Sequence, residues 1–348
     1  MMDSQPLVSI IIPTYNGEKR IARTLGAITD QDYGNLEIIV VDDVSTDDTV
    51  ETARRALEDS GRKFRIIERT INGRQSASRN TGLDAANGKY VIFFDHDDLA
   101  DADFVSSLCA EAEAKKADVV FCGIKEYHED NGQYTYNPVR LKSPPASSKD
   151  YLTMWARHEL DLCYVWCCIF RRDFLVSNGL RFPEKCYISE DLELVLKAIA
   201  LSESTSFVPK TLYTYVRHSG QQSTAEYSHR RDHRIFRQAV LSEYRAARVI
   251  IRNTSSSYVK DYALSFLVAH EILKEFTLTA RDGDKERYMK MLKVLRHRKI
   301  RQMMMCTVKF MFVEPEMFFK SMVLLYAPKL YYRLRNKPCP DKQDRTRG

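Results

Sequence analysis

The 348-residue sequence lacks any apolar run near the ~18 residues that a membrane-spanning helix needs. It also begins without a basic stretch and without an apolar run long enough for a secretory signal. Its eight cysteines form no CxxC pair, and several lie in apolar runs such as VVFCGI, which argues against a zinc site or a disulfide framework. We therefore expect a cytoplasmic protein with reduced thiols.

Two sequence motifs of other enzyme classes are also missing. No GxGxxG follows the first apolar run, which argues against a dinucleotide-dependent oxidoreductase. The turn after that run, PTYNGEK, lacks the Gly-rich, Arg/Lys-containing loop of a sugar nucleotidyltransferase. No nucleic-acid-binding motif accompanies the basic residues, so we expect no nucleic acid partner.

Charge is distributed unevenly along the chain, although the net charge is only +6. Residues 281–348 contain 18 Lys+Arg and 7 Asp+Glu, a balance of +11, whereas residues 1–280 have a balance of −5. Within this basic tail, segment 302–337 alternates aromatic residues and methionines with lysines and arginines. It could lie at an anionic membrane surface as a peripheral element. The alternative is a helical subdomain that packs on the body of the protein with its charge solvated.

Strand and helix patterns alternate through the first hundred residues. Short β-branched runs predict buried strands at 7–12, 36–41, 64–67 and 90–94, and helical spacing predicts helices at 18–28, 50–57 and 76–86. Alternation at this pitch predicts an α/β fold, with a mainly parallel sheet covered by helices on both faces.

The pattern becomes mixed further along the chain. We expect helices at 101–115 and 191–200, a strand at 119–123, and two short strands at 205–208 and 212–216. From about residue 225 nearly everything predicts helix, in segments near 229–252, 257–280, 284–296 and 302–334, with Pro315 and Pro328 breaking the last. The predicted domains are a catalytic domain over 1–224, with halves 1–110 and 111–224, and a C-terminal helical, basic region over 225–348.

The stretch YVIFFDHDDL places an acidic cluster directly after an apolar strand. Asp95 and Asp97 are two residues apart, so in an extended segment both side chains project to the same side and could hold one cation. Asp98 could add a bond through water. Carboxylate oxygens favour Mg²⁺ or Mn²⁺, and Mg²⁺ is usually shared with substrate phosphates. The alternative is a solvated acidic loop that caps the helix at Asp101.

Two long segments carry a family resemblance: VSIIIPTYNGEKRIARTLGAITDQDYGNLEIIVVDDVSTDDT and SASRNTGLDAANGKYVIFFDHDD. Together they resemble glycosyltransferase family 2, closely over residues 6 to about 110 and more loosely to about 224. The resemblance implies the GT-A fold and inverting transfer of a sugar from a nucleotide-diphosphate donor.

The resemblance also implies roles for residues of the first half. It assigns donor binding to Pro13, Tyr15, Asp43, Arg79 and Asp95, and metal binding to Asp97 and Asp98. In this assignment Asp43 binds the uracil ring, Pro13 and Tyr15 pack on the base and ribose, and Arg79 lies near the diphosphate. Tyr15 could instead be a turn aromatic that covers the core, and Arg79 could form a surface ion pair. We expect His96 to point away from the site.

In the second half, FPEKCYISEDLEL resembles the family segment that supplies the catalytic base. The match makes Asp191 the general base and Glu190 its neighbour, although the same acids could simply cap a helix. Trp166, in VWCCIF, matches the acceptor side, where Cys167 departs from the Asn often seen, although Trp166 could instead be a core tryptophan. Arg217 and His218 match a loop, 213–224, that closes over the diphosphate, with His218 near the metal.

These assignments predict an inverting glycosyltransferase that needs Mn²⁺ or Mg²⁺. We expect it to use a UDP-sugar and to extend a glycan or polyprenyl-linked acceptor in cell-surface polysaccharide biosynthesis, at the cytosolic face of the membrane. The alternative is a catalytically decayed module that only binds a sugar or nucleotide. The acids at 43, 95, 97, 98 and 191 argue against decay because all of them are retained.

Overall fold

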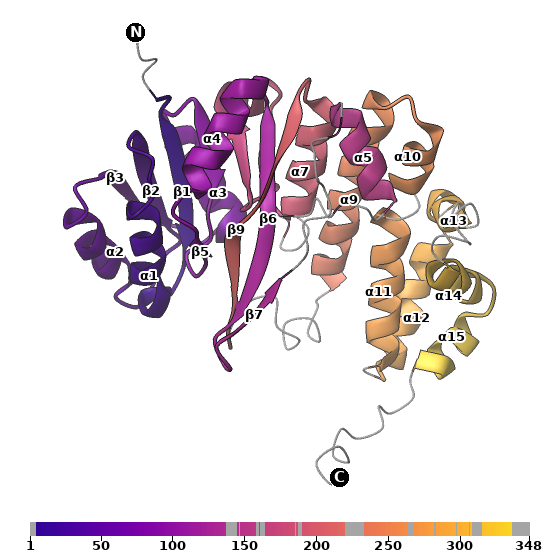
Figure 1. The fold of residues 1–348 in the computed structure, drawn as a ribbon. Coiled ribbons are helices and arrows are strands. Elements are labelled where there is room, and N and C mark those ends of the chain that lie inside the picture. The colour runs from indigo at the N-terminus through magenta and orange to yellow at the C-terminus, as the bar shows by residue number, and fades with distance from the viewer. Residues whose placement is uncertain are drawn as a thin grey trace, which may run out of the picture.

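The computed structural model combines a curled α/β sheet with a group of C-terminal helices, as Figure 1 shows. It describes residues 5–136, 145, 147–157, 160, 164–184, 186, 190–219, 233–263, 267–281, 283–296, 298–305, 307 and 315–335. The strand order is β3-β2-β1-β4-β8-β6-β9-β5, with β7 added to β6.

The first half of the sheet is parallel, as the sequence predicts. It contains β1 (Val8–Thr14), β2 (Leu36–Asp42), β3 (Lys63–Glu68) and β4 (Tyr90–Phe93). The connecting helices are α1 (Glu18–Thr29), α2 (Thr49–Glu58) and α3 (Arg74–Ala85). Every residue of β1 and β2 is buried, because these mostly apolar runs are covered by helices on both faces.

The second half of the sheet is mixed. Strand β8 (Cys168–Arg171) is antiparallel to both β4 and β6 (Val119–His128), and β5 (Leu99–Ala100) is antiparallel to β9 (Thr205–Arg217). Strand β7 (Gln133–Tyr136) forms a hairpin with β6. The two short strands expected at 205–208 and 212–216 are one strand, β9, because exposed Pro209 and Lys210 bulge out where the pairing with β6 shifts register.

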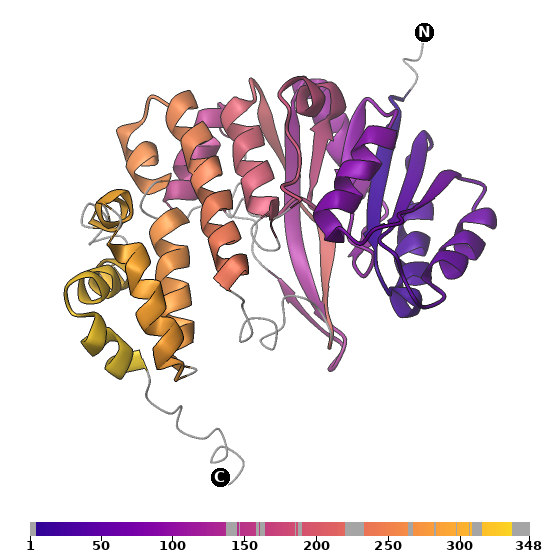
Figure 2. The ribbon, with the colours of Figure 1, turned by 180° about the vertical axis from the view of Figure 1, so that it is seen from behind.

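Four helices accompany this half: α4 (Phe104–Lys115), α5 (Ser148–Ala156), α6 (Arg172–Ser177) and α7 (Glu190–Leu201). Helix α4 packs on β6, β8 and β9, and α7 packs on α9 (His233–Asn253), an arrangement visible from behind in Figure 2. In the core between α4 and the sheet, the rings of Phe94, Phe104 and Tyr213 contact one another.

The remaining C-terminal helices are α10 (Ser257–Tyr262), α11 (Val268–Arg281), α12 (Lys285–Leu295), α13 (Arg298–Met305), α14 (Pro315–Tyr326) and α15 (Pro328–Arg335). Pro315 and Pro328 each begin a helix, which suits proline because the first turn needs no backbone N–H bond. The predicted boundary at 224/225 lies outside the described residues and stays a prediction.

Helices α11 to α15 enclose a second apolar core, separate from the large core around the sheet. Its buried side chains include Phe276, Tyr288, Met304, Leu324 and Tyr331. In the part of the chain that the structure describes, none of the helices has both the length and the apolar character needed to cross a bilayer.

Candidate active site

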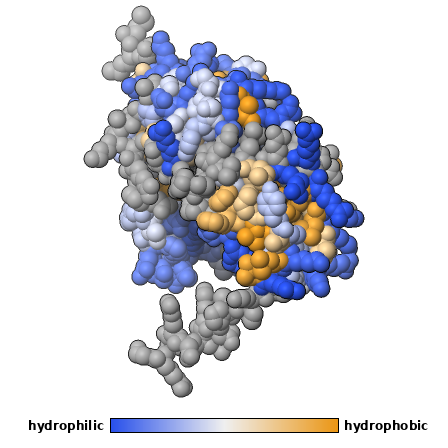
Figure 3. All heavy atoms as spheres, turned by 90° about the vertical axis from the view of Figure 1, so that its right-hand side faces the viewer, coloured by the Kyte–Doolittle hydropathy of each residue, from blue (hydrophilic) through white to orange (hydrophobic). Residues whose placement is uncertain are grey.

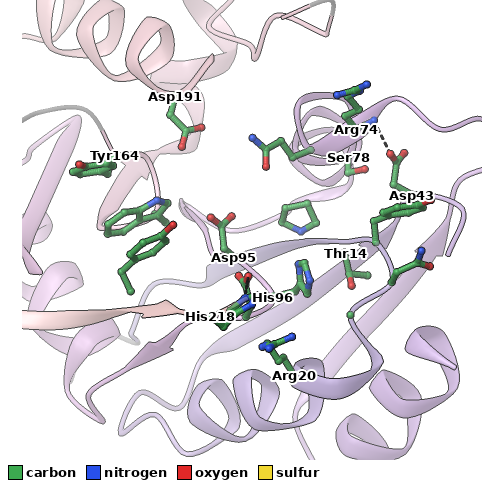
Figure 4. A pocket seen from close by; sticks show the side chains of 18 of the residues that line it. Thr14, Arg20, Asp43, Arg74, Ser78, Asp95, His96, Tyr164, Asp191 and His218 are labelled. Carbon is green, nitrogen blue, oxygen red and sulfur yellow. Dashed lines mark hydrogen bonds and ion pairs between the residues drawn. The ribbon is translucent and has the colours of Figure 1, made fainter. Parts of the chain in front are cut away.

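A cavity of about 1040 Å³ opens at the carboxyl ends of the parallel strands. Figure 4 shows that side chains from the β1 turn, α3, the acidic loop after β4, α7 and the end of β9 point into it. The predicted site residues that line it are Pro13, Tyr15, Asp43, Asp95, Asp97, Trp166, Asp191, Arg217 and His218. The topology therefore gathers at one sheet edge residues that lie far apart in the sequence.

Asp43 marks one end of the cavity, directly after β2. Its buried carboxylate accepts hydrogen bonds from the backbone N–H groups of Gly73, at 3.0 Å, and Arg74, at 2.5 Å, and pairs with Arg69. The neighbouring Asp42 instead accepts from the Ser45 backbone N–H at 2.9 Å and so fixes the turn. Tyr15 is 47% exposed, so its ring stands in the cavity wall instead of covering the core.

Arg79 lies behind the cavity wall, on α3, with only 1% of its side chain exposed. Its Nη2 donates to Asp95 Oδ1 at 2.7 Å and its Nη1 to Asp191 Oδ1 at 2.5 Å. A third carboxylate, Glu190, lies 3.7 Å from Nη1. The ion pairs of Arg79 are thus buried, so the alternative of a surface ion pair is wrong. Its predicted place near the diphosphate stays a prediction, because the guanidinium contacts the carboxylates of the site and does not line the cavity. Without the guanidinium the buried acids would be uncompensated.

This cluster shifts the protonation of Asp191. Burial, opposed by the attraction of Arg79 and aided by the negative charges of Glu190 and Asp95, raises the pKa of Asp191 to about 8. Burial also raises the pKa of Glu190, which lies behind Asp191 and accepts a hydrogen bond from Gln75. The Asp191 side chain remains 20% exposed toward the cavity. A carboxylate with this pKa at a substrate-sized cavity has the properties of a general base.

Asp97 and His218 meet across the cavity floor, with 2.9 Å between Asp97 Oδ2 and His218 Nε2. Burial tends to raise the pKa of Asp97, but the hydrogen bond from His218 and the nearby imidazole of His96 hold it below its usual range. The same hydrogen bond raises the pKa of His218. Among the described residues no group of three or more His, Cys, Asp or Glu side chains converges on a metal position.

His96 lines the cavity, so the expectation that it points away is wrong. Its ring packs against Gly17, where an added Cβ would lie 2.5 Å from the imidazole Cδ2. The glycine in PTYNG therefore leaves room for the imidazole at the cavity wall.

Asp98 is fully buried and does not reach the cavity surface. Its carboxylate accepts hydrogen bonds from the Tyr213 hydroxyl and the Val216 backbone N–H, both at 2.7 Å. Burial, together with the charges of Asp97 and Asp95, raises the pKa of Asp98 well above its usual range. Asp98 therefore connects β9 to the acidic loop through these hydrogen bonds. The sequence predicts Asp98 as a metal ligand, but its side chain lies behind the cavity wall and does not line the cavity.

Aromatic rings form the opposite wall. Trp166 is 5% exposed and stacks with Tyr164, at a centroid distance of 4.7 Å, and with Tyr215, at 5.6 Å. Arg217 lies over the Tyr215 ring and pairs with Glu126 at 3.0 Å. Sequence reasoning missed Tyr164, Tyr215 and Glu126. The alternation of Tyr213, Tyr215 and Arg217 along β9 was the available signal.

Two buried hydroxyls also line the cavity and were missed. Within the described part of the chain, neither Thr14 Oγ1 nor Ser78 Oγ has a hydrogen-bond partner. Ser78 follows Arg74 by one helical turn, so both side chains lie on the face of α3 that borders the cavity. An unpaired buried hydroxyl is costly, and a bound polar ligand would satisfy it.

Comparison with known proteins agrees with this geometry. Residues 9–177 match the family described as Glycosyl transferase family 2. The uncharacterized glycosyltransferase EpsJ of Bacillus subtilis is 33% identical over 213 residues, which is 60% of this chain and 61% of that protein. A Campylobacter jejuni protein named GalNAc(5)-diNAcBac-PP-undecaprenol beta-1,3-glucosyltransferase is 28% identical over 186 residues, covering 53% of this chain and 57% of that one. The chain thus spans about three fifths of the length of these curated relatives.

The fold has a close counterpart among solved structures. The crystal structure of Staphylococcus aureus TarS 1–349 in complex with UDP-GlcNAc superimposes with a TM-score of 0.66 at 21% identity, covering 95% of this chain and 88% of that one. The match extends through the C-terminal helices, beyond the segment that carries the family motifs. Residues 9–177 are therefore similar in sequence to glycosyltransferase family 2, and the sheet and helices have the GT-A fold.

Proposed function

We propose that this protein is an inverting glycosyltransferase that transfers a sugar from a UDP-sugar to a hydroxyl of a glycan or lipid-linked glycan in cell-surface polysaccharide biosynthesis. One observation carries the proposal: Asp191, with its pKa near 8, borders the same cavity as Asp95 and Asp97 and is tied to Asp95 through Arg79. The UDP-GlcNAc complex of TarS and the names of the relatives support the class of donor and acceptor.

The two ends of the cavity fit the two ends of such a donor. At one end, Asp43 offers an acceptor carboxylate for a ring N–H of the base, with Tyr15 and Pro13 beside it. Toward the other end, Arg217 and His218 border the cavity together with Arg20, and their charge favours a diphosphate. In this proposal the nucleobase binds at the Asp43 end of the cavity and the diphosphate binds further along the sheet edge.

Asp97 and His218 fit a divalent cation beside the diphosphate. Both side chains line the cavity, and a carboxylate oxygen with an imidazole nitrogen suits Mn²⁺ better than Mg²⁺, which prefers oxygen alone. Two protein ligands would leave the other positions to phosphate oxygens and water, and the ion would stabilise the charge of the departing diphosphate.

The transfer itself follows from the position of Asp191. Its carboxylate accepts the proton of the acceptor hydroxyl as that oxygen attacks the anomeric carbon from the side opposite the diphosphate. A new C–O bond forms, the bond between the anomeric carbon and the phosphate oxygen breaks, and its electron pair stays on the diphosphate. Arg79 holds the carboxylates of Asp191 and Asp95 at a fixed separation. Trp166, with Tyr164 and Tyr215 stacked on it, borders the acceptor side.

Calorimetric titration with UDP, GDP and CDP, with and without Mn²⁺, tests the donor site, and UDP release from UDP-sugars tests turnover. We expect Mn²⁺-dependent binding of UDP, lost in Asp97→Ala, and an Asp191→Asn variant that binds UDP but transfers no sugar. A folded protein that binds UDP yet turns over no UDP-sugar with any acceptor would instead be the decayed binding module. We also propose a peripheral location at the cytosolic face of the membrane, which the basic C-terminal region supports.

A further inference from the structure

Helix α14 is apolar on two opposite faces. One face carries Met317, Leu324 and Leu325, which are buried in the second core. On the other face Phe319 and Tyr326, seven residues apart, are 63% and 65% exposed. A helix that is apolar all round is normally covered on both sides. We therefore expect another molecular surface to cover the exposed face of α14.

Helix α15 also carries exposed apolar side chains beside a buried one. Tyr331 is buried, whereas Leu330 and Leu334, four residues apart, are 49% and 51% exposed. We call Phe319, Tyr326, Leu330 and Leu334 the apolar patch. Figure 3 shows apolar side chains gathered on the face that bears the C-terminal helices, with hydrophilic residues around them.

Cations accompany the apolar patch. Residues 315–335 contain four Lys or Arg and one Glu, a balance of +3, and the glutamate, Glu316, already pairs with Lys320. Lys329 and Arg333 are exposed beside Leu330 and Leu334 on α15. Apolar and aromatic side chains flanked by exposed cations match the interface of a bilayer with negatively charged headgroups.

We propose that the apolar patch, with Lys329 and Arg333, docks the protein on an anionic lipid bilayer. A second copy of the chain fits less well because it would bring two positively charged surfaces together. In Figures 1 and 2, α15 and the β6–β7 hairpin beside the cavity lie toward the same side of the molecule. The inference rests on the proposed function only in that a lipid-linked acceptor would then reach the cavity from the docked side.

Vesicle flotation tests the docking of the full chain. Wild-type protein should float with vesicles of equal parts phosphatidylglycerol and phosphatidylcholine, much less with phosphatidylcholine alone, and less at high salt. Lys329→Gln with Arg333→Gln should weaken binding by about fivefold for each charge removed. Phe319→Ser with Leu330→Ser should weaken it by at least about tenfold.

Control variants remove apolar or charged groups elsewhere on the surface: Ile71→Ser, on a side chain that is 75% exposed, and Lys89→Gln with Arg54→Gln, on side chains that are 50% and 42% exposed. They should float like wild type. Equal loss in the control variants, or no flotation of wild type, would overturn the proposal. So would wild-type dimers, seen by sedimentation without lipid, that Phe319→Ser converts to monomers. UDP titration of the same variants separates this result from the proposed transfer reaction, since a protein that binds UDP but no vesicles contradicts the docking and the peripheral location and leaves the glycosyltransferase proposal standing.

Discussion

The guanidinium of Arg79 bridges Asp95 and Asp191, at 2.7 Å and 2.5 Å, and so connects the loop after β4 to the first turn of α7. These two acids belong to different parts of the proposed chemistry, one beside the donor and the other at the acceptor hydroxyl. Because Arg79 is buried and on a helix, it fixes their separation. The donor site and the base are therefore coupled through one side chain.

Replacing Arg79 tests this coupling. Arg79→Lys keeps the charge but loses the two-pronged geometry, so we expect kcat to fall by about a hundredfold or more. Arg79→Met removes the charge that lowers the pKa of Asp191, so any residual activity should need a still higher pH. It should also cost about 3–5 kcal/mol of folding stability, because buried carboxylates lose their counter-ion.

Thermal unfolding and pH–rate profiles check these effects. Arg181→Met is the matched control, because Arg181 pairs with Asp84 at the surface, and it should leave both measurements near wild type. An Arg79→Lys enzyme with wild-type kcat would show that the bridge has no part in catalysis.

The rate of transfer should depend on the ionisation of Asp191. The base works only when deprotonated, so kcat/KM should rise with pH and level off above the Asp191 pKa of about 8. Steady-state kinetics across this range, with saturating metal, measures the rise. An increase complete by pH about 5, as for an ordinary carboxylate, would contradict the assignment.

Metal binding should depend on His218. His218→Asn should weaken the Mn²⁺-dependent part of UDP binding by at least about tenfold, a loss typical even of side chains that only support metal ligands. The hydrogen bond to Asp97 raises the pKa of His218, so protonation should weaken Mn²⁺ binding as the pH falls, at a higher pH than for an ordinary histidine. Calorimetry with UDP and Mn²⁺ at several pH values measures both effects. Unchanged Mn²⁺ affinity in the variant would remove His218 from the metal site.

The unpaired hydroxyl of Ser78 should contribute to binding of the donor. Ser78→Ala should raise the Kd for UDP or the KM for the UDP-sugar by about three- to tenfold, the value of one hydrogen bond. Ser76 offers a matched control in the same helix, since its hydroxyl is also buried and unpaired among the described residues but does not line the cavity. Equal effects of the two substitutions would indicate loss of helix packing instead of loss of a ligand contact.

Local pattern predicted most of the sheet. The runs that form β1 and β2 are mostly apolar and rich in β-branched residues, which predicts strands that are buried on both faces of the sheet. Likewise, the acids after β4 and the acids that open α7 stand out because charge follows directly on apolar sequence. Strand β9 was harder to predict, because Pro209 looks like an end when its partner strand is unknown.

The α/β order of the first half and the chemical groups at its strand ends depend on neighbouring residues, so both can be predicted from the sequence. Which of these groups meet depends on how distant segments pack. His218 reaches Asp97 across 121 positions, and Arg79 reaches Asp191 across 112. The same packing buries Asp98 beneath β9, whereas Asp97 faces the cavity. Spacing cannot fix these outcomes, since burial and partner choice arise when distant segments pack together.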